Sequence, residues 1–328
     1  MLVDRVFRWV VAVVALIAAT VGVAGAGAGA AAKPVAQAGV VEVMNVWSAS
    51  MGRSIPLRVL RPADRSVPRP TLYLLNGAGG GEDEANWFDR TDVVRFFTDK
   101  NVNVVVPMQG AFSYYTDWRR DDPELGRNKW TTFLTRELPP VVDERLGANG
   151  VNAIAGISMA GTSVLSLAES VPGLYRGVAA YSGCAETSTR YGELYIKLVV
   201  ESRGKGNTEN MWGPSDGPGW RANDPVVNAE KLRGHTIYVS NGSGLPGQHD
   251  RIDGPGIDGD LELFANQMIL GTVIEAATNQ CTIHLKRRLD ELSIPATFDF
   301  VPVGTHSWPY WQDQLHRSWP VLARSLRS

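Results

Sequence analysis

Short apolar runs alternate with longer stretches of helical spacing along most of this chain. The first two runs flank the sequence M-G-R at 51–53, which predicts an opening β-hairpin. Strands are expected at 40–47, 55–60, 71–75, 102–106, 152–155, 178–181, 237–239 and 297–301. Helices are expected at 129–146, 159–169, 261–277, 282–292 and after residue 306. This alternation predicts an α/β fold with a mostly parallel central sheet and helices on both faces.

Two segments stand apart from this alternation. Residues 1–38 carry two arginines, an apolar run and a terminal A-Q-A motif, which is the pattern of a cleaved secretory signal peptide. A retained membrane anchor is the alternative, but the run is short for a membrane span. Residues 184–235 are polar and rich in Gly and Pro, so we expect an insertion over the carboxyl edge of the sheet. The remainder, 39–328, is expected to be a single secreted or envelope-located domain with no further membrane span.

Composition adds three constraints. The formal net charge of −2 gives no reason to expect nucleic acid or an anionic membrane surface as a partner. The two cysteines, Cys184 and Cys281, predict one disulfide in an exported chain, with two unpaired thiols as the alternative. None of the five histidines pairs with cysteines at ligand spacing, so we expect no metal site.

The sequence G-I-S-M-A-G at 156–161 joins an expected strand to an expected helix. In α/β-hydrolases a G-x-S-x-G motif in this context makes a sharp turn that exposes the serine hydroxyl. The motif alone occurs by chance, and a serine here could simply cap the helix. Its strand–turn–helix context makes Ser158 the candidate nucleophile.

A serine nucleophile needs a histidine to take its proton and a carboxylate to orient that histidine. The order of the triad in this fold is serine, acid, histidine. His306 follows the last expected strand and precedes the last helix, where this fold carries its base. Spacing alone favours Asp250 as the acid, because it follows the strand at 237–239, although five other candidate carboxylates lie at 253–275.

A glycine-rich turn, N-G-A-G-G-G at 76–81, follows the strand at 71–75. Glycines let backbone N–H groups approach a substrate oxygen, and this fold takes one oxyanion donor from such a turn and one from the residue after the nucleophile. We therefore predict the backbone amides of Ala78 and Met159 as the oxyanion hole. A phosphate-binding loop is the alternative, but neither a dinucleotide fingerprint nor a Walker lysine is present.

Several of these segments together resemble the mycolyltransferases of the antigen 85 type, and their corynebacterial members most of all. The resemblance spans nearly the whole chain after the signal peptide. It rests on the sequences S-M-G-R at 50–53, Y-L-L-N-G at 73–77, G-I-S-M-A-G at 156–161, M-W-G-P at 211–214, N-D-P at 223–225 and G-T-H-S-W at 304–308.

The resemblance implies a different acid from the one that spacing favours. In this family the catalytic carboxylate is a glutamate on a helix about thirty residues before the histidine, which implies Glu275 rather than Asp250. The disulfide would then tie the loop after the strand at 178–181 to the helix that bears Glu275. The chain departs from the mycobacterial members at Asn76 and Gly79, where they have aspartate and arginine that help to hold trehalose. The segment associated with fibronectin binding is not recognisable at 93–100.

The implied activity is transfer of a mycolyl group from trehalose monomycolate to a second trehalose monomycolate or to cell-wall arabinan, through an acyl-serine. Candidate substrate contacts are polar or aromatic residues near the expected site: Asn76, Gly77, Asn86, Trp87, Tyr115, Trp118, Ser307 and Trp308. A secreted carboxylesterase would carry the same triad and differ only in letting water take the acyl group. A non-catalytic wall-binding module is the alternative of another class, and the complete triad counts against it.

Overall fold

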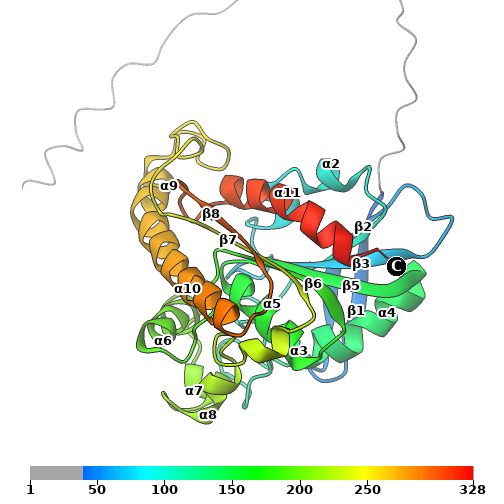
Figure 1. The fold of residues 1–328 in the computed structure, drawn as a ribbon, viewed down its shortest axis with the longest axis horizontal. Coiled ribbons are helices and arrows are strands. Elements are labelled where there is room, and N and C mark those ends of the chain that lie inside the picture. Colours follow the sequence, from blue (N-terminus) through cyan, green and yellow to red (C-terminus); the bar gives the residue numbers. More distant parts are fainter. Residues whose placement is uncertain (1–39, 328) are drawn as a thin grey trace, which may run out of the picture. The chain divides into compact units, whose positions relative to one another are not determined.

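A single eight-stranded sheet forms the centre of the fold (Figure 1). The computed structural model describes residues 40–327, and the predicted signal peptide at 1–38 lies outside the described residues. The strands follow the order β1-β2-β4-β3-β5-β6-β7-β8. Their bounds are β1 (Val40–Ser48), β2 (Arg53–Arg61), β3 (Arg69–Leu75), β4 (Asn103–Pro107), β5 (Ala148–Ile157), β6 (Tyr175–Tyr181), β7 (Thr236–Gly242) and β8 (Thr297–Val301).

Only the first edge of the sheet is antiparallel. The hairpin β1–β2 and the pair β2–β4 are antiparallel, whereas every pairing from β4 through β8 is parallel. The predicted α/β fold with a mostly parallel sheet is therefore confirmed, and the parallel strands direct their carboxyl ends toward one edge.

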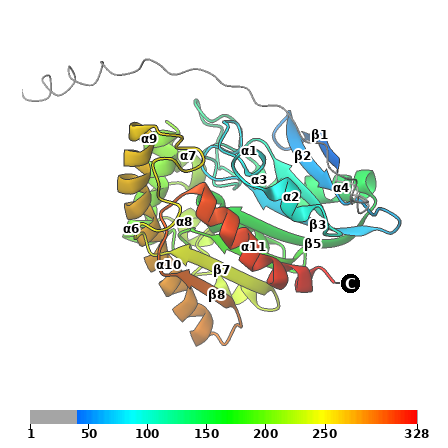
Figure 2. The same cartoon turned by 90° about the horizontal axis from the view of Figure 1, so that it is seen from above.

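Helices cover both faces of the sheet, as Figure 2 shows from above. Strand β3 illustrates the period of two: Tyr73 and Leu75 join the core on one face, and Leu72 and Leu74 join the core on the other. The first core is closed by α3 (Trp130–Thr132), the π-helical turn η1 (Phe133–Glu137), α4 (Leu138–Leu146), α5 (Met159–Ser170) and α10 (Thr272–Glu291). The second core is closed by α1 (Trp87–Arg90), α2 (Val93–Phe97) and α11 (Trp308–Ser325).

One helix boundary predicted from the sequence is wrong. The chain continues from α9 (Leu261–Asn266) through the π-helical turn η4 (Gln267–Gly271) into α10 without the expected break near residue 280. The residues there are weak helix formers, but Thr278 and Cys281 are buried. Contacts with the core keep this segment helical, because tertiary packing overrides a weak local preference.

The segment at 184–235 connects β6 to β7 and holds short helices. These are α6 (Arg190–Lys197), the π-helical turn η2 (Leu198–Arg203), α7 (Thr208–Trp212), α8 (Pro218–Ala222) and the 3-10 turn η3 (Ala229–Leu232). Met211 and Trp220 are buried, and η3 packs on α5, so the segment belongs to the first core. Among residues 40–327, no helix is long and apolar enough to cross a membrane.

Candidate active site

Ser158 lies on a strained turn between β5 and α5. Its φ of 55° and ψ of −122° are unfavourable for a residue with a side chain. The flanking glycines allow this turn, since a Cβ at Gly156 would lie 2.8 Å from the Cβ of Ala160, and one at Gly161 would lie 2.6 Å from the carbonyl oxygen of Tyr181. The Ser158 N–H donates to that same carbonyl, at 2.8 Å. The elbow is therefore locked against β6, with its hydroxyl directed away from the sheet toward His306.

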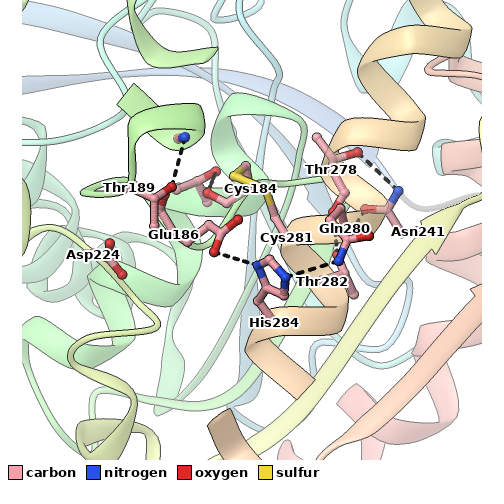
Figure 3. The surroundings of a disulfide bond; sticks show 12 residues. Cys184, Glu186, Thr189, Asp224, Asn241, Thr278, Gln280, Cys281, Thr282 and His284 are labelled. Atoms are coloured by element: carbon pink, nitrogen blue, oxygen red, sulfur yellow. Dashed lines mark hydrogen bonds and ion pairs between the residues drawn. A yellow bond between two sulfur atoms is a disulfide. The ribbon is translucent and has the colours of Figure 1, made fainter. Parts of the chain in front are cut away.

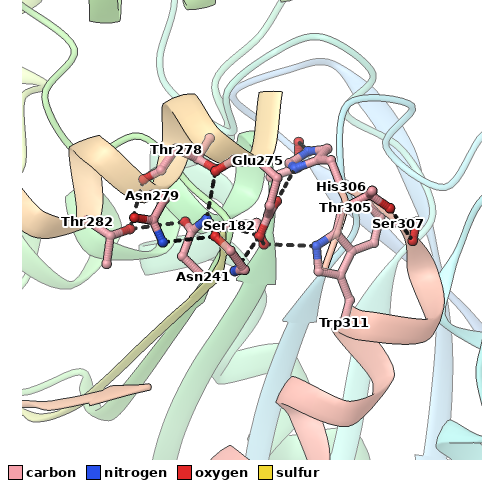
Figure 4. Close-up of polar contacts among 12 residues, drawn as sticks. Ser182, Asn241, Glu275, Thr278, Asn279, Thr282, Thr305, His306, Ser307 and Trp311 are labelled. Atoms are coloured by element: carbon pink, nitrogen blue, oxygen red, sulfur yellow. Dashed lines mark hydrogen bonds and ion pairs between the residues drawn. The ribbon is translucent and has the colours of Figure 1, made fainter. Parts of the chain in front are cut away.

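His306 lies in the loop between β8 and α11, and its ring joins the serine to a carboxylate. The Nε2 atom is 2.8 Å from Ser158 Oγ, and the Nδ1 atom is 2.7 Å from Glu275 Oε2. The Trp311 ring stands perpendicular to the imidazole, at 4.8 Å between centroids. The backbone N–H of His306 donates to Gly271 O. Ring packing and the backbone contact together hold the imidazole between its two partners. Figure 4 shows its contact with Glu275 and the neighbouring Trp311.

Glu275 has a complete set of hydrogen-bond donors although its residue is only 1% exposed. Its Oε1 atom accepts from Ser182 Oγ at 2.8 Å, from Asn241 Nδ2 at 3.0 Å and from the Gly242 N–H at 2.6 Å (Figure 4). Three donors on one oxygen leave Oε2 to His306. A buried carboxylate is stable in the ionised form only when it is paired in this way.

Two of those donors were not foreseen from the sequence. Ser182 follows the last residue of β6, and Asn241 is the penultimate residue of β7. Polar residues at the carboxyl ends of adjacent parallel strands meet at one edge of the sheet, so this pattern is a signal that could have identified them. Trp311 Nε1 donates to Ser182 Oγ, which extends the same network to α11.

Asp250, the acid that spacing alone favours, is not in contact with His306, and that interpretation is wrong. Its Oδ2 atom accepts from the Gly247 N–H and the Tyr310 hydroxyl, both at 2.7 Å. Its Oδ1 atom accepts from Gln267 and from Thr305. Asp250 thus fastens the loop after β7 to η4 and α11, and its four donors leave it no role toward the imidazole.

The turn at 76–78 lies beside the serine. A Cβ on Gly77 would be 3.7 Å from the Cβ of Ser158. The buried Asn76 side chain fixes the turn, because its Nδ2 donates to Pro107 O and its Oδ1 accepts from the Trp87 N–H. The Ala78 carbonyl accepts from the Phe112 N–H at 2.7 Å. The turn that carries Ala78 and the start of α5 that carries Met159 therefore both border the Ser158 side chain.

Three aromatic residues expected to contact substrate are core residues instead. Trp87 and Trp118 have no exposed surface and Tyr115 is 1% exposed, so none presents a face to a sugar. The two indole N–H groups donate to backbone carbonyls, those of Leu75 and Ser113. The structure therefore corrects the prediction that these three residues contact substrate, because their rings are buried in the core.

The other expected substrate contacts have mixed positions. Asn86 caps α1, and its Oδ1 accepts from the backbone N–H groups of Phe88 and Asp89. Ser307 is the N-cap residue of α11 and is buried. Trp308, the next residue, is half-buried and packs edge-to-face on Trp87 at 5.4 Å. Trp308 is thus the member of the predicted aromatic set whose ring reaches the surface near His306.

The structure contains the predicted disulfide between Cys184 and Cys281, whose Cα atoms are 5.0 Å apart (Figure 3). It joins the loop after β6 to α10, six residues beyond Glu275. Beside it, the His284 Nδ1 atom lies 2.8 Å from Glu186 Oε2. Within residues 40–327, the only grouping of metal-type side chains comprises these two cysteines and Glu186, and the disulfide occupies both sulfur atoms.

Comparison with known proteins places this geometry among acyl-transferring and ester-cleaving enzymes. The Esterase family model matches residues 48–321. The diacylglycerol acyltransferase/mycolyltransferase Ag85A of Mycobacterium leprae is 32% identical over 324 residues, which cover 95% of this chain and 91% of that protein. Ag85A of Mycobacterium tuberculosis is 33% identical over 323 residues, which cover 95% and 89% of the two chains.

Solved structures show the same fold at lower sequence identity. Mycobacterium tuberculosis MPT51 superposes with a TM-score of 0.72 at 24% identity, covering 88% of this chain and 99% of that one. An S-formylglutathione hydrolase from Agrobacterium tumefaciens has a TM-score of 0.66 at 16% identity, covering 90% and 99%. Both comparisons support the α/β-hydrolase fold.

Proposed function

Because this chain belongs to the esterase family that includes the Ag85 mycolyltransferases, and is therefore an acyltransferase or esterase, we propose that it transfers long-chain acyl groups through Ser158. The observation that carries this proposal is the unbroken chain of contacts from Glu275 through His306 to Ser158, at 2.7 Å and 2.8 Å. That arrangement matches the requirement for a serine nucleophile, which needs an oriented base within hydrogen-bonding reach.

In the proposed first half-reaction, His306 Nε2 takes the hydroxyl proton as Ser158 Oγ attacks the ester carbonyl of the donor. The amides of Ala78 and Met159 stabilise the oxyanion of the tetrahedral intermediate, and removal of one such donor typically costs about 10²–10³-fold in kcat. His306 then gives the proton to the departing sugar oxygen, which leaves an acyl-serine. Glu275 holds the imidazole in the tautomer with its proton on Nδ1 and stabilises the charged form.

In the second half-reaction, a hydroxyl of the acceptor attacks the acyl-serine and His306 acts as base again. The family implies trehalose monomycolate as the donor, and a second trehalose monomycolate or cell-wall arabinan as the acceptor. No cofactor takes part in either step. Ser307 and Trp308 at the start of α11 are the proposed substrate contacts nearest to the base, together with Gly77 beside the serine.

An exported location follows the same proposal. The signal peptide predicted at 1–38 would deliver the domain at 39–328 to the cell envelope. The disulfide between Cys184 and Cys281 supports this location, because such bonds persist in oxidising compartments.

Hydrolysis is the second candidate, and the match to the Esterase family favours it. The two activities share every step up to the acyl-serine and differ in whether water or a sugar hydroxyl attacks it. Incubation of the purified protein with trehalose monomycolate separates them, since transfer yields trehalose dimycolate and hydrolysis yields free mycolic acid.

The Ser158→Ala variant tests the proposal itself. We expect it to lose both products by at least about 10⁴-fold and to resist labelling by a fluorophosphonate probe. The exposed Ser202→Ala variant is the matched control and should keep wild-type rates. Labelling of the Ser158→Ala variant, or full activity in it, would exclude an acyl-serine at this position. A wild-type protein that is neither labelled nor active would favour a wall-binding role instead.

A further inference from the structure

A cavity lies beside α5, and its lining does not include Ser158, Glu275 or His306. It is called the cavity behind α5 below. It measures about 140 Å³ and lies between α5, the loop at 114–116 and the insertion. Its lining is rich in side-chain hydroxyls, contributed by Thr116, Thr131, Thr162, Ser163, Ser166 and Ser170. Exposed residues at its margin, among them Ala222 and Lys231, show that it reaches the surface.

Two residues of the family-specific motifs in the insertion line this hollow. Trp212 Nε1 donates to Thr116 Oγ1 at 3.3 Å, and Thr116 Oγ1 donates to Asn223 Oδ1 at 3.1 Å. Neither residue has a place in the proposed acyl-transfer steps. The motifs that distinguish the insertion therefore build the wall of a separate cavity.

Glu169, on the last turn of α5, lines this cavity and has an unpartnered carboxyl oxygen. The residue is 5% exposed, and its Oε1 atom is buried and has no hydrogen-bond partner. An unpaired buried polar atom is costly, and such atoms in native structures usually meet water or a ligand. Burial raises the pKa of the Glu169 carboxyl well above its ordinary value, so the group favours its neutral form, although the charge of Lys231 opposes the effect.

The hydrogen bonds of the wall hydroxyls indicate which hydrogen-bonding groups a ligand needs. Ser163, Ser166 and Ser170 donate to the backbone carbonyls of Tyr114, Asn223 and Leu167, and Thr162 donates to that of Cys184. Their oxygen lone pairs are left to accept. A neutral carboxyl adds one donor and one acceptor, so the wall matches groups that both donate and accept, as alcohols do.

Charge and size narrow the choice further. The oxygen lone pairs of the wall disfavour an anion, and Lys231 at the margin disfavours a cation. A cavity of about 150 Å³ holds a molecule with about six non-hydrogen atoms, such as benzene, when its walls are apolar. Glycerol has the same number of non-hydrogen atoms and the hydrogen-bonding pattern that this polar wall requires.

We propose that the cavity behind α5 is a binding site for a small neutral polyol of the glycerol type. This site is independent of the acyl-transfer proposal, because none of its lining residues belongs to the catalytic relay. A ligand of this size is expected to bind with a Kd on the order of 1–10 mM, since each non-hydrogen atom of a small ligand contributes little.

Saturation-transfer NMR with glycerol on the Ser158→Ala protein tests the proposal without turnover. We expect saturable binding that weakens at least tenfold in Ser166→Leu, which fills the cavity, and in Glu169→Leu, which removes the unpartnered carboxyl. The matched control is Ser202→Leu, which lies outside the cavity and should bind as the parent does. Circular dichroism and thermal unfolding show whether each variant is folded.

A crystal structure of the wild-type protein in glycerol provides the second measurement. Glycerol hydrogen-bonded to Glu169 would support the proposal. Ordered water only, at glycerol concentrations far above the expected Kd, would overturn it. Binding that survives both cavity variants would also overturn it, as would displacement of glycerol by sodium or ammonium ions at equal concentration.

Discussion

Two buried glutamates on helices of the first core differ in their hydrogen-bond partners. Glu275 on α10 is 1% exposed, accepts three hydrogen bonds at one oxygen and contacts His306 with the other. Glu169 on α5 is 5% exposed, and its Oε1 atom has no partner. Burial is almost equal, so the difference lies in the donors that the neighbouring strand ends provide. Depth of burial alone therefore does not distinguish the carboxylate that contacts His306, whereas the set of partners does.

The Glu275→Gln substitution is the strongest test of this difference. Three donors hold Oε1, so an amide would keep its oxygen there and turn its NH₂ group toward His306 Nδ1. The imidazole would then carry its proton on Nε2 and could not accept one from Ser158. We expect kcat to fall by about 10⁴-fold with stability nearly unchanged, measured by steady-state rates and urea unfolding.

Asp250→Asn is the informative counterpart of that variant. It disturbs a carboxylate that has four donors and does not contact His306. We therefore expect the free energy of unfolding to fall by more than the activation free energy rises, as urea unfolding and the change in kcat measure them. A loss of kcat in Asp250→Asn as large as that in Glu275→Gln would break the assignment of the acid.

Removal of the disulfide tests how much this bond to the helix of Glu275 contributes to the stability of the protein. Closing a loop of 97 residues stabilises a protein by about 4–5 kcal/mol in the chain-entropy model, and measured losses are about 2–5 kcal/mol. We expect Cys184→Ser/Cys281→Ser to lower the unfolding free energy within that range while kcat at 25 °C stays close to the wild-type value. Dithiothreitol should destabilise the wild type to the same degree and leave the double variant unchanged. Equal stability of the wild type and the double variant in the absence of dithiothreitol would contradict the prediction.

The donors to Glu275 can be removed one at a time. Asn241→Ala takes away a hydrogen bond to a buried charged group, which is worth about 1.5–3 kcal/mol, and so should lower kcat by about 10–100-fold. Asn279 donates to the Gly242 carbonyl nearby without touching the carboxylate, which makes Asn279→Ala the matched control. Equal effects of the two alanine variants on kcat would mean that Asn241 acts only through the local fold.

The sequence predicted the parts of the Ser158–His306–Glu275 arrangement that depend on a local pattern, and it failed where the contact is long-range. The elbow at Ser158 and the loop of His306 were predicted because glycine spacing and strand order act within a few residues of each group. The acid was misplaced by spacing, since the helix of Glu275 reaches the imidazole only through the packing of α10 on β7. The resemblance to the family pointed to Glu275, the carboxylate that contacts His306, where the local pattern could not.

Burial of aromatic side chains was the other point that the sequence left open. Trp87 and Trp118 are of a residue type that can stack on sugars, yet neither has any exposed surface. The cavity at Glu169 was equally hidden, because its wall combines α5 with residues of the insertion that are more than forty positions away in the chain. Contacts of that range depend on the whole fold, and no local pattern encodes them.

The smallest expected effect comes from Glu169→Gln, which should raise the stability of the protein, whereas the variants above lower activity or stability. Its folded-state pKa is raised by burial, so the folded protein holds a proton that the unfolded chain loses above the ordinary carboxyl pKa. The contribution of Glu169 to stability is therefore fully present below that pKa and is lost as the pH rises through the folded-state value. The Glu169→Gln variant cannot titrate, so it should match the wild type near pH 4 and exceed it by about 1–3 kcal/mol at pH 7. Urea unfolding at a series of pH values measures this difference, and a gap that stays constant with pH would show that burial does not raise the folded-state pKa of Glu169. Because Glu169 touches neither Ser158 nor His306, kcat should be the same in both proteins, in contrast to the variants at Glu275.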